Sequence, residues 1–320
     1  MAARLAAATL MGALATAAAV AADPYPARPV RVVIPTSPGG LLDITTRIVG
    51  TKVTEMSGKP VVIDNRPGAS NNIGTELVAR APADGYTLLA VTLPFVVNPS
   101  MFKSVPYDPQ RDFAPVSQLI AAPYVLVTNP SLPVKSVKEL VALAKARPGA
   151  LNYASGGSGT NLHVAAELFA LTARVKMTHV PYKGGGPALA SVLSGETALS
   201  FPSLAAVLPH VNGNRLRALG VTTLKANALL PDVPPIAATL PGYEFSSWIG
   251  LLAPAGTPQE VVAAINGYWV KALQAQDVAA RFAADGSEVI ANSPQEFSQV
   301  IRTQVARWAK VIQAAGLRAQ

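Results

Sequence analysis

The sequence predicts an α/β protein with two lobes. Runs of aliphatic and β-branched residues lead into a glycine-containing loop and then into apolar residues at helical spacing, an order typical of βαβ units with parallel strands. Units of this kind begin at about residues 30, 61, 151 and 178. The chain has 320 residues, of which 50% are hydrophobic, and that is enough to bury two separate cores.

The first unit contains the turn around which the rest is organised. Residues 30–34 (VRVVI) are expected to form a buried strand. The turn Ser37-Pro38-Gly39-Gly40 ends this strand, because glycine permits a tight turn with positive φ. A helix opening directly after it presents unpaired N–H groups and the positive end of its dipole to an anion. The turn therefore predicts half of a carboxylate-binding site, with a purely structural turn as the alternative.

The remaining elements follow in order. Strands at 61–63 and 86–92 with a helix at 73–81 complete a parallel βαβαβ unit, residues 98–113 are irregular, and 116–127 form one long strand or a strand pair. A second α/β set follows, with strands expected at 151–155, 178–181, 198–201 and 216–221.

The C-terminal part is expected to return to the first lobe. A strand is predicted at 244–253, after a proline-rich stretch. Capping boxes at Ser136, Thr257 and Ser293, each with a glutamate three residues on, open helices. The last helix should bury Phe297, Ile301, Val305, Trp308 and Ile312. These elements divide the chain into residues 23–128 with 246–320 as lobe 1, and residues 129–245 as lobe 2.

The N-terminus predicts a secretory signal peptide over residues 1–22. Arg4 is the only charge before Asp23, an Ala/Leu-rich run covers 5–20, and small residues suit cleavage after Ala21 or Ala22. A membrane anchor is the weaker alternative, because the run is short and mostly alanine.

Composition excludes several function classes. The chain has no cysteine, which rules out disulfides, thiol catalysis and cysteine-bound metal. His163, His179 and His210 have no metal-ligand spacing, so no metal is expected. The net charge is +8, but the basic residues are scattered, which argues against a nucleic-acid partner.

Enzymatic motifs are absent or incomplete. Gly157-Ser158-Gly159 follows a strand but fails the G-x-S-x-G spacing, and Walker A and G-x-G-x-x-G motifs do not occur. His163 as a catalytic base for Ser158 or Thr160 is less favoured than a histidine that packs or caps within the first helical turn. What remains is a set of donors that hold a carboxylate without transforming it: Asn72, Ser155, Ser158, Thr160, Asn161 and Lys183. Asp43 either stabilises its helix N-terminus, which is favoured, or accepts a bond from a ligand or water.

Several strings then carry a family resemblance. They are Tyr25-Pro26-Ala27-Arg28-Pro29-Val30, Pro38-Gly39-Gly40 with Asp43, Asn65-Arg66-Pro67-Gly68-Ala69, Asp84-Gly85-Tyr86-Thr87-Leu88, His179-Val180-Pro181-Tyr182-Lys183-Gly184 and Ala253-Pro254-Ala255-Gly256-Thr257-Pro258. In these strings the chain resembles, almost end to end, the substrate-binding proteins of tripartite tricarboxylate transporters, the Bug (TctC-like) family.

The resemblance implies a type II periplasmic-binding-protein fold, in which two lobes close on a small carboxylate. It implies a periplasmic monomer that uses no cofactor and delivers its ligand to membrane permease subunits. The implied ligand-binding residues are Ser37, Gly39, Gly40, Asp43, Asn72, Ser155, Gly156, Gly159, Thr160, Asn161 and Lys183.

Two alternatives to transport stay open: a ligand sensor that partners a signalling kinase, and an enzyme using the same cleft. The chain also departs from the family at Leu41-Leu42, where relatives have small or polar residues. Either leucine would favour a more apolar ligand, such as an aromatic or longer-chain acid, if it faces the cleft.

Overall fold

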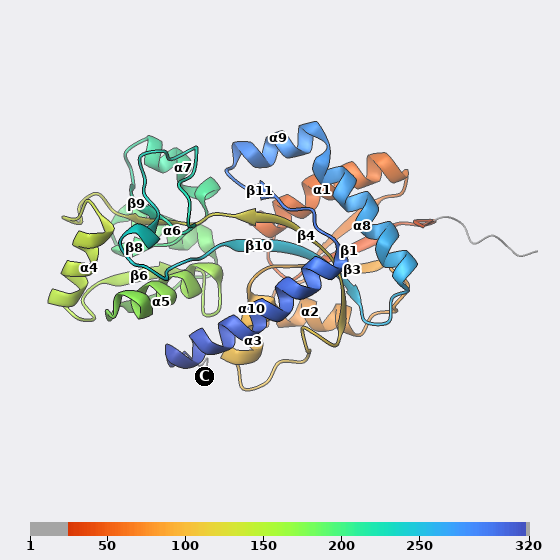
Figure 1. Cartoon of the computed structure of the whole chain (residues 1–320), viewed down its shortest axis with the longest axis horizontal. Helices are drawn as coiled ribbons and strands as arrows, with labels where there is room; N and C mark the ends of the chain where they lie inside the picture. The colour runs from red at the N-terminus through yellow and green to blue at the C-terminus, as the bar shows by residue number, and fades with distance from the viewer. Residues whose placement is uncertain (1–24, 318–320) are drawn as a thin grey trace, which may run out of the picture.

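The computed structural model describes residues 25–317, so the predicted signal peptide lies outside the described residues. Two sheets, each covered by helices, form two lobes (Figure 1). Two long neighbouring strands, β4 (Phe113–Ala122) and β10 (Ser247–Pro254), run from the first lobe toward the second. Within the described residues, no helix is both long and apolar enough to cross a membrane.

The first sheet has the order β11-β4-β10-β3-β1-β2. Strand β1 (Val30–Ile34) pairs in parallel with β2 (Val61–Asn65) and β3 (Thr87–Val91), which confirms the predicted parallel unit. Strand β10 lies antiparallel between β3 and β4, and the short β11 (Glu288–Val289) extends the edge beside β4. The sheet is therefore completed by segments far apart in the sequence.

The second sheet has the order β7-β6-β8-β5-β9. Its strands are β5 (Val125–Thr128), β6 (Asn152–Ser155), β7 (Thr178–Pro181), β8 (Leu199–Ser200) and β9 (Arg217–Val221). Strands β6, β7 and β8 are parallel, and β5 is antiparallel to both β8 and β9. All strands but β5 consequently end at the same edge.

Helices cover both sheets. In chain order they are α1 (Leu41–Ser57), α2 (Asn72–Ala79), α3 (Pro94–Met101), α4 (Val137–Ala146), α5 (Asn161–Ala173), α6 (Gly185–Ser194), α7 (Leu204–Asn212), α8 (Gln259–Gln274), α9 (Gln276–Ala284) and α10 (Pro294–Ala314), with short 3₁₀ turns at Ala69–Asn71 and Ile236–Ala238.

Two expectations for the first half of the chain need correction. Residues 94–101, partly predicted as irregular, form α3, in which Pro99 is tolerated. Residues 116–127, predicted as one long strand or a strand pair, contain parts of two strands that do not pair with each other: β4 ends at Ala122 and β5 begins at Val125 in the other sheet. The chain therefore changes sheets around Pro123.

The predicted helix caps have different outcomes. Ser293 and Glu296 form a complete capping box at α10. The Ser136 hydroxyl accepts the Glu139 N–H, although the Glu139 carboxylate accepts the N–H of Lys135. The Thr257 prediction is wrong, because its hydroxyl donates to the Pro254 carbonyl and α8 begins only at Gln259.

The core is continuous between the lobes. One cluster contains Leu89 from the first sheet, Leu126 and Leu219 from the second, and Phe297 of α10. The predicted buried face of α10 is confirmed, with Val305 only half-buried. A Cβ on Gly250 of β10 would lie 2.1 Å from the Phe297 ring. Glycine at this position therefore lets α10 pack directly on the crossing strand.

Candidate ligand-binding site

The carboxyl ends of the parallel strands in the two sheets meet at the junction of the lobes. The loop after β6 touches α3 of the first lobe: a Cβ on Gly159 would lie 3.3 Å from Asn98 Oδ1 and 3.2 Å from Met101 Sδ. Ligands of open α/β sheets bind in the crevice beyond the carboxyl ends of strands. The loops expected to bind ligand in both lobes all follow such strand ends.

The Pro-Gly-Gly turn is an exposed loop anchored by Asp43. Gly39 has φ +85°, and no atom lies within 4 Å of the point that a Cβ would occupy there. Its N–H donates to Asp43 Oδ2 at 3.0 Å, and Arg47 Nε and Asn65 Nδ2 each donate to the same carboxylate at 3.0 Å. Asn65 also donates to the Thr36 carbonyl. The carboxylate thus holds the turn against α1 and the end of β2.

The surroundings of Asp43 keep it ionised. Burial by itself would raise the pKa of this carboxyl, but hydrogen bonds from Arg47, the Gly39 N–H and Asn65 outweigh burial and lower the pKa below its ordinary value. Only 3% of the residue is exposed. Its oxygens are occupied within lobe 1, so the structure places Asp43 as the support of the turn.

The two leucines that depart from the family lie away from the exposed surface of the turn. Leu42 is buried in the lobe 1 core with Val49 and Val53, and Leu41 packs partly against the same cluster. The exposed apolar side chain of this first helical turn is Ile44, at 42%. Leu42 therefore does not face the cleft, and it gives no reason to expect a more apolar ligand.

Asn72 is linked to a residue that the sequence did not indicate. Asn98 of α3 is fully buried and donates from Nδ2 to Asn72 Oδ1 at 3.0 Å and to the Ser70 carbonyl at 2.7 Å. Among residues 25–317, its Oδ1 has no hydrogen-bond partner, and it lies next to Gly159. Asn98 therefore connects the lobe 1 loop before α2 with the lobe 2 loop before α5. No motif would have indicated it, since its position depends on α3.

The loop after β6 is braced from inside. Ser155 is fully buried, and its Oγ accepts the Gly157 N–H at 3.1 Å and lies 2.6 Å from His179 Nε2. Thr160 Oγ1 donates to the Gly157 carbonyl at 2.7 Å. The Ser155 and Thr160 hydroxyls thus shape this loop, and the Thr160 N–H also donates to the Gly157 carbonyl.

The loops after β6 and β7 are in direct contact. A Cβ on Gly156 would lie 3.0 Å from the Gly184 carbonyl carbon and 3.1 Å from the Gly185 nitrogen. A side chain at position 156 would crowd this contact, which brings the exposed Lys183 beside the loop that precedes α5. No hydrogen bond joins these loops to the Pro-Gly-Gly turn within the part of the chain that the structure describes.

Asn161 binds the strands that connect the lobes. Its Nδ2 donates to Tyr124 Oη at 2.8 Å and to Ser247 Oγ at 2.9 Å, and lies 3.4 Å from Thr92 Oγ1. Tyr124 follows β4 and Ser247 begins β10. The amide nitrogen of Asn161 is therefore occupied by residues at the crossing strands.

Two histidines lie beneath the same loop. His163 Nδ1 accepts the Gly159 N–H at 3.2 Å, and the His163 and His179 rings are 4.2 Å apart. Burial, together with the neighbouring His179, lowers the pKa of His163 to about 3, and burial lowers the pKa of His179. Both rings are therefore neutral at ordinary pH, with Nδ1 of His163 unprotonated.

This arrangement predicts acid sensitivity. The unfolded chain takes up a proton on His163 below about pH 6.5 whereas the folded chain does not until about pH 3. The free energy of unfolding should consequently fall as the pH decreases through this window, by about 1.4 kcal/mol per pH unit from this residue. His163→Asn keeps an acceptor near the Gly159 N–H without titrating. Urea unfolding from pH 8 to 4 should give a flatter profile for the variant. Parallel profiles would contradict the assignment.

The helices that begin at this junction lack side-chain caps. Helices α1, α2, α5 and α6 start with no side-chain hydrogen bond to their first turn, whereas α4 and α10, which start elsewhere, are capped by serines. Helices α8 and α9 are also uncapped, so the feature is not confined to the junction. The unpaired backbone N–H groups at such a helix N-terminus are available to bind an anion.

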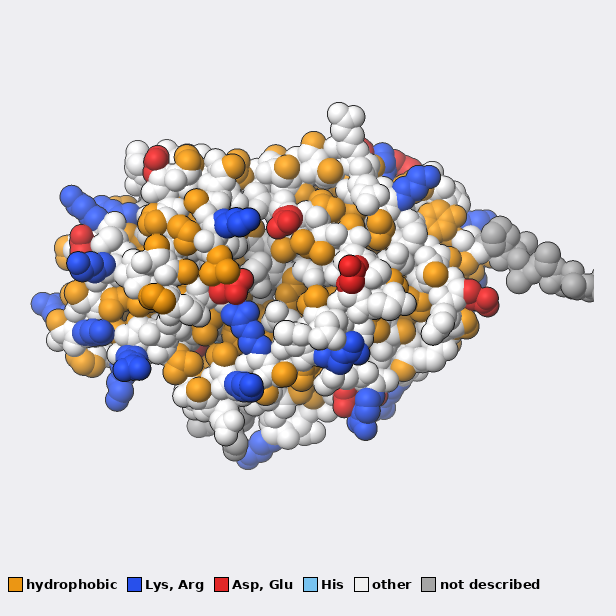
Figure 2. Space-filling model, in the orientation of Figure 1, with side chains coloured by type: hydrophobic (Ala, Val, Ile, Leu, Met, Phe, Trp, Pro, Cys, Tyr) orange, Lys and Arg blue, Asp and Glu red, His pale blue; other side chains and the backbone are white. Residues whose placement is uncertain are grey.

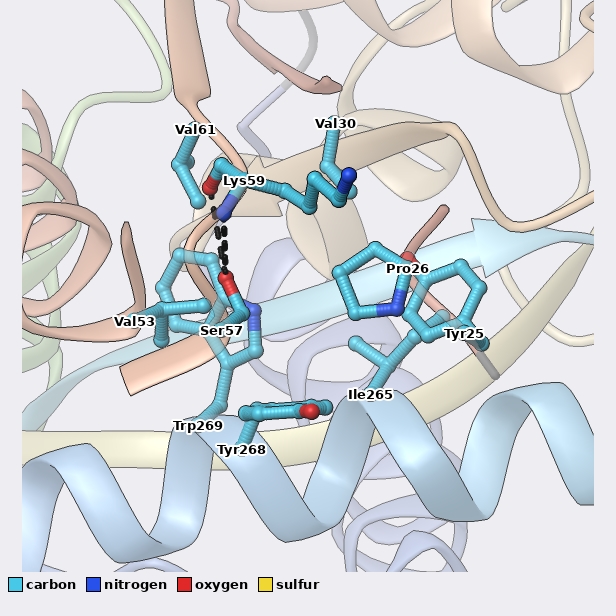
Figure 3. A pocket seen from close by; sticks show the side chains of 10 residues that line it. All are labelled: Tyr25, Pro26, Val30, Val53, Ser57, Lys59, Val61, Ile265, Tyr268 and Trp269. Carbon is cyan, nitrogen blue, oxygen red and sulfur yellow. Dashed lines mark hydrogen bonds between the residues drawn. The ribbon is translucent and has the colours of Figure 1, made fainter. Parts of the chain in front are cut away.

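A small cavity in lobe 1 is not a competing site. It has a volume of about 10 Å³ and lies between the N-terminal segment, α1 and α8 (Figure 3). Its walls are mainly apolar side chains such as Tyr25, Ile265 and Trp269. This cavity is too small for an organic acid. It is a packing gap where Tyr25 and Pro26 lie against α8.

Comparisons with known proteins agree with this geometry. The profile of the TctC family, the tripartite tricarboxylate transporter family receptor, matches residues 45–317. Protein BugT of Bordetella pertussis is 37% identical over 305 residues, which cover 94% of each chain. The structure of R. palustris Rpa4515 with adipate has a TM-score of 0.86 and 36% identity, over 92% of this chain and 99% of that chain.

The periplasmic binding protein BugD has a TM-score of 0.84 and 30% identity, over 92% of this chain and 100% of that chain. These likenesses confirm the expected type II periplasmic-binding-protein fold. They also confirm a binding function without catalysis, because the matching family is one of receptors. The chain belongs to the TctC, or Bug, family of tripartite tricarboxylate transporter receptors.

Proposed function

We propose that the chain is a periplasmic solute-binding protein that captures a small organic carboxylate between its lobes and delivers it to tripartite tricarboxylate transporter permease subunits. The observation that carries this proposal is the pair of uncapped helix N-termini, α5 and α6, brought together by the Gly156 contact. Two N-termini side by side offer several N–H donors and two helix dipoles to one carboxylate.

In this proposal, the ligand carboxylate is bound mainly by residues of lobe 2. Backbone N–H groups at Gly159, Thr160 and Gly185, with the exposed Lys183 ammonium, are suited to one carboxylate group. Gly159 donates its N–H to His163, and Thr160 donates its N–H to the Gly157 carbonyl, so both would have to change partner on binding. The proposed role of Ser155 and Asn161 is indirect, since their side chains brace the loop and the crossing strands.

Lobe 1 would bind the remainder of the ligand. The proposed donors are the exposed N–H of Gly40 and the Nδ2 of Asn72, with Ser37 at the rim and Asp43 as support. The Gly39 N–H donates to Asp43 and would have to change partner to bind the ligand. Two donor sets in facing lobes suit an acid with a second polar group. Adipate, bound by Rpa4515, has this form. On the face shown in Figure 2, Lys and Arg are scattered over both lobes.

A ligand screen tests the proposal. Thermal unfolding would be followed with mono-, di- and tricarboxylates, including adipate, malate, citrate and benzoate. A ligand that binds only the folded state at 100 times its Kd stabilises by about 2.7 kcal/mol, so at least one acid should give a clear upward shift in Tm. Matched neutral diamides are the control. No shift with any aliphatic or aromatic acid would overturn the proposal.

A further inference from the structure

A second groove lies between the lobes, away from the proposed ligand loops. It has a volume of about 210 Å³ and is lined by residues from the end of β4, the loop after β9 and the turn between α9 and β11. We call it the rear groove, defined by Pro123, Lys225, Asn227, Gly286 and Glu288.

The sheet orders place the rear groove opposite the ligand loops. In the first sheet, β11 lies on one side of β4 and β10, whereas β3, β1 and β2 lie on the other. In the second sheet, β9 lies on one side of β5, and β8, β6 and β7 lie on the other. If the lobes rotate about the crossing strands, closing the ligand side opens the rear side. Under such a rotation, the ligand side and the rear side move in opposite senses: one closes as the other opens.

Gly286 makes a close contact in this groove. It has φ +70°, and a Cβ there would lie 2.5 Å from Leu204 Cδ2 and 3.2 Å from Leu229 Cδ1. Asn227 Nδ2 also donates to the Gly286 carbonyl at 3.4 Å. Leu204 is fully buried and its N–H donates to the Pro123 carbonyl at the point where the chain changes sheets. The contact therefore lies close to the crossing strands.

We propose that Gly286 is a positioning residue for ligand binding, because its contact with Leu204 and Leu229 sets the balance between open and closed lobes. The absence of a side chain at this position lets the rear groove close and the ligand side open. Added volume there favours the closed form. This inference rests on the proposed function. The apparent Kd equals the intrinsic Kd divided by the closed fraction, so affinity reports this balance.

Substitutions of opposite volume give the test. Gly286→Asn adds a side chain that tolerates positive φ, and should tighten adipate binding by about 3- to 10-fold, in proportion to the closed fraction. Leu229→Ala removes volume from the same contact and should weaken binding by a similar factor. Gly58→Asn is the matched control, because Gly58 has φ +68° with nothing within 4 Å of its Cβ position. Gly58→Asn places asparagine at a similar positive φ, but its side chain meets no atom of the other lobe.

An interlobe distance separates this inference from the function itself. The chain has no cysteine, so Val62→Cys on β2 and Lys176→Cys just before β7 allow specific spin labelling of two exposed positions on the ligand side. Without ligand, the distance between the labels should shorten in Gly286→Asn and lengthen in Leu229→Ala. Unchanged distances and unchanged Kd would overturn the inference while adipate binding by the unsubstituted protein stands. Absence of acid binding with shifted distances would instead overturn only the proposed function.

Discussion

Replacing Gly156 by valine should weaken carboxylate binding about 100-fold. Its Cβ would lie 3.0 Å from the Gly184 carbonyl carbon, a backbone atom that cannot rotate away. The loops after β6 and β7 would have to separate, and the N-termini of α5 and α6 with them. Overpacking costs about 1–3 kcal/mol, and every 1.4 kcal/mol is a tenfold change in affinity. We expect a loss of about 100-fold, measured by isothermal titration calorimetry with the acid selected by the screen.

The control for Gly156 is a glycine with room for a side chain. Gly267 lies in α8 with nothing within 4 Å of its Cβ position, and Gly267→Ala should leave affinity unchanged and raise stability slightly through helix propensity. Gly156→Ala should fall between the two. Full affinity in Gly156→Val would show that the spacing of α5 and α6 does not determine binding.

Replacing Asp43 by alanine should destabilise the protein and weaken binding together. The change leaves the Gly39 N–H, Asn65 Nδ2 and Arg47 without their shared acceptor. A typical hydrogen bond contributes about 0.5–1.5 kcal/mol, and these three bonds are only partly buried, so we expect the free energy of unfolding to fall by about 2–4 kcal/mol. The Pro-Gly-Gly turn would lose its anchor, so the ligand would also have to order it on binding.

Comparison with a second acid on the same helix isolates this effect. Glu55 pairs only with Lys52 on the surface of α1, and Glu55→Ala should change stability by less than about 0.5 kcal/mol. Asp43→Asn should recover little, because its amide N–H faces donors. Urea unfolding and calorimetry at pH 7 measure both quantities. An Asp43→Ala variant that loses affinity at full stability would indicate a direct ligand contact.

Periodic elements were predictable from the sequence because a local pattern specifies them. The strand–loop–helix units at β1–α1 and β6–α5 are examples, and the open helix N-termini follow from them. Helix α3 was not predictable, because Phe95, Val96 and Val97 are all buried and leave no polar face to mark a helix. Asn98 was missed for the same reason, since its contacts exist only once α3 packs between the lobes.

Side-chain roles within the predicted loops also required tertiary structure. Ser155 and Asn161 are hydrogen-bond donors in the right loop, yet the first meets His179 and the second meets Tyr124 and Ser247. These partners are distant in sequence, so no spacing rule relates them. Leu42 was ambiguous for a similar reason: its packing against Val49 depends on which face of α1 covers the sheet.

The position of β10 between β3 and β4 has a consequence for biogenesis. A chain that emerges from its N-terminus presents β1 to β4 early, but the central strand of that sheet arrives only with residues 247–254. The second sheet, formed entirely by residues 125–221, needs no later segment. Non-local strand pairing is slow and leaves edges exposed meanwhile. Lobe 2 is thus the natural first folding unit, and lobe 1 stays open to chaperones until β10 arrives.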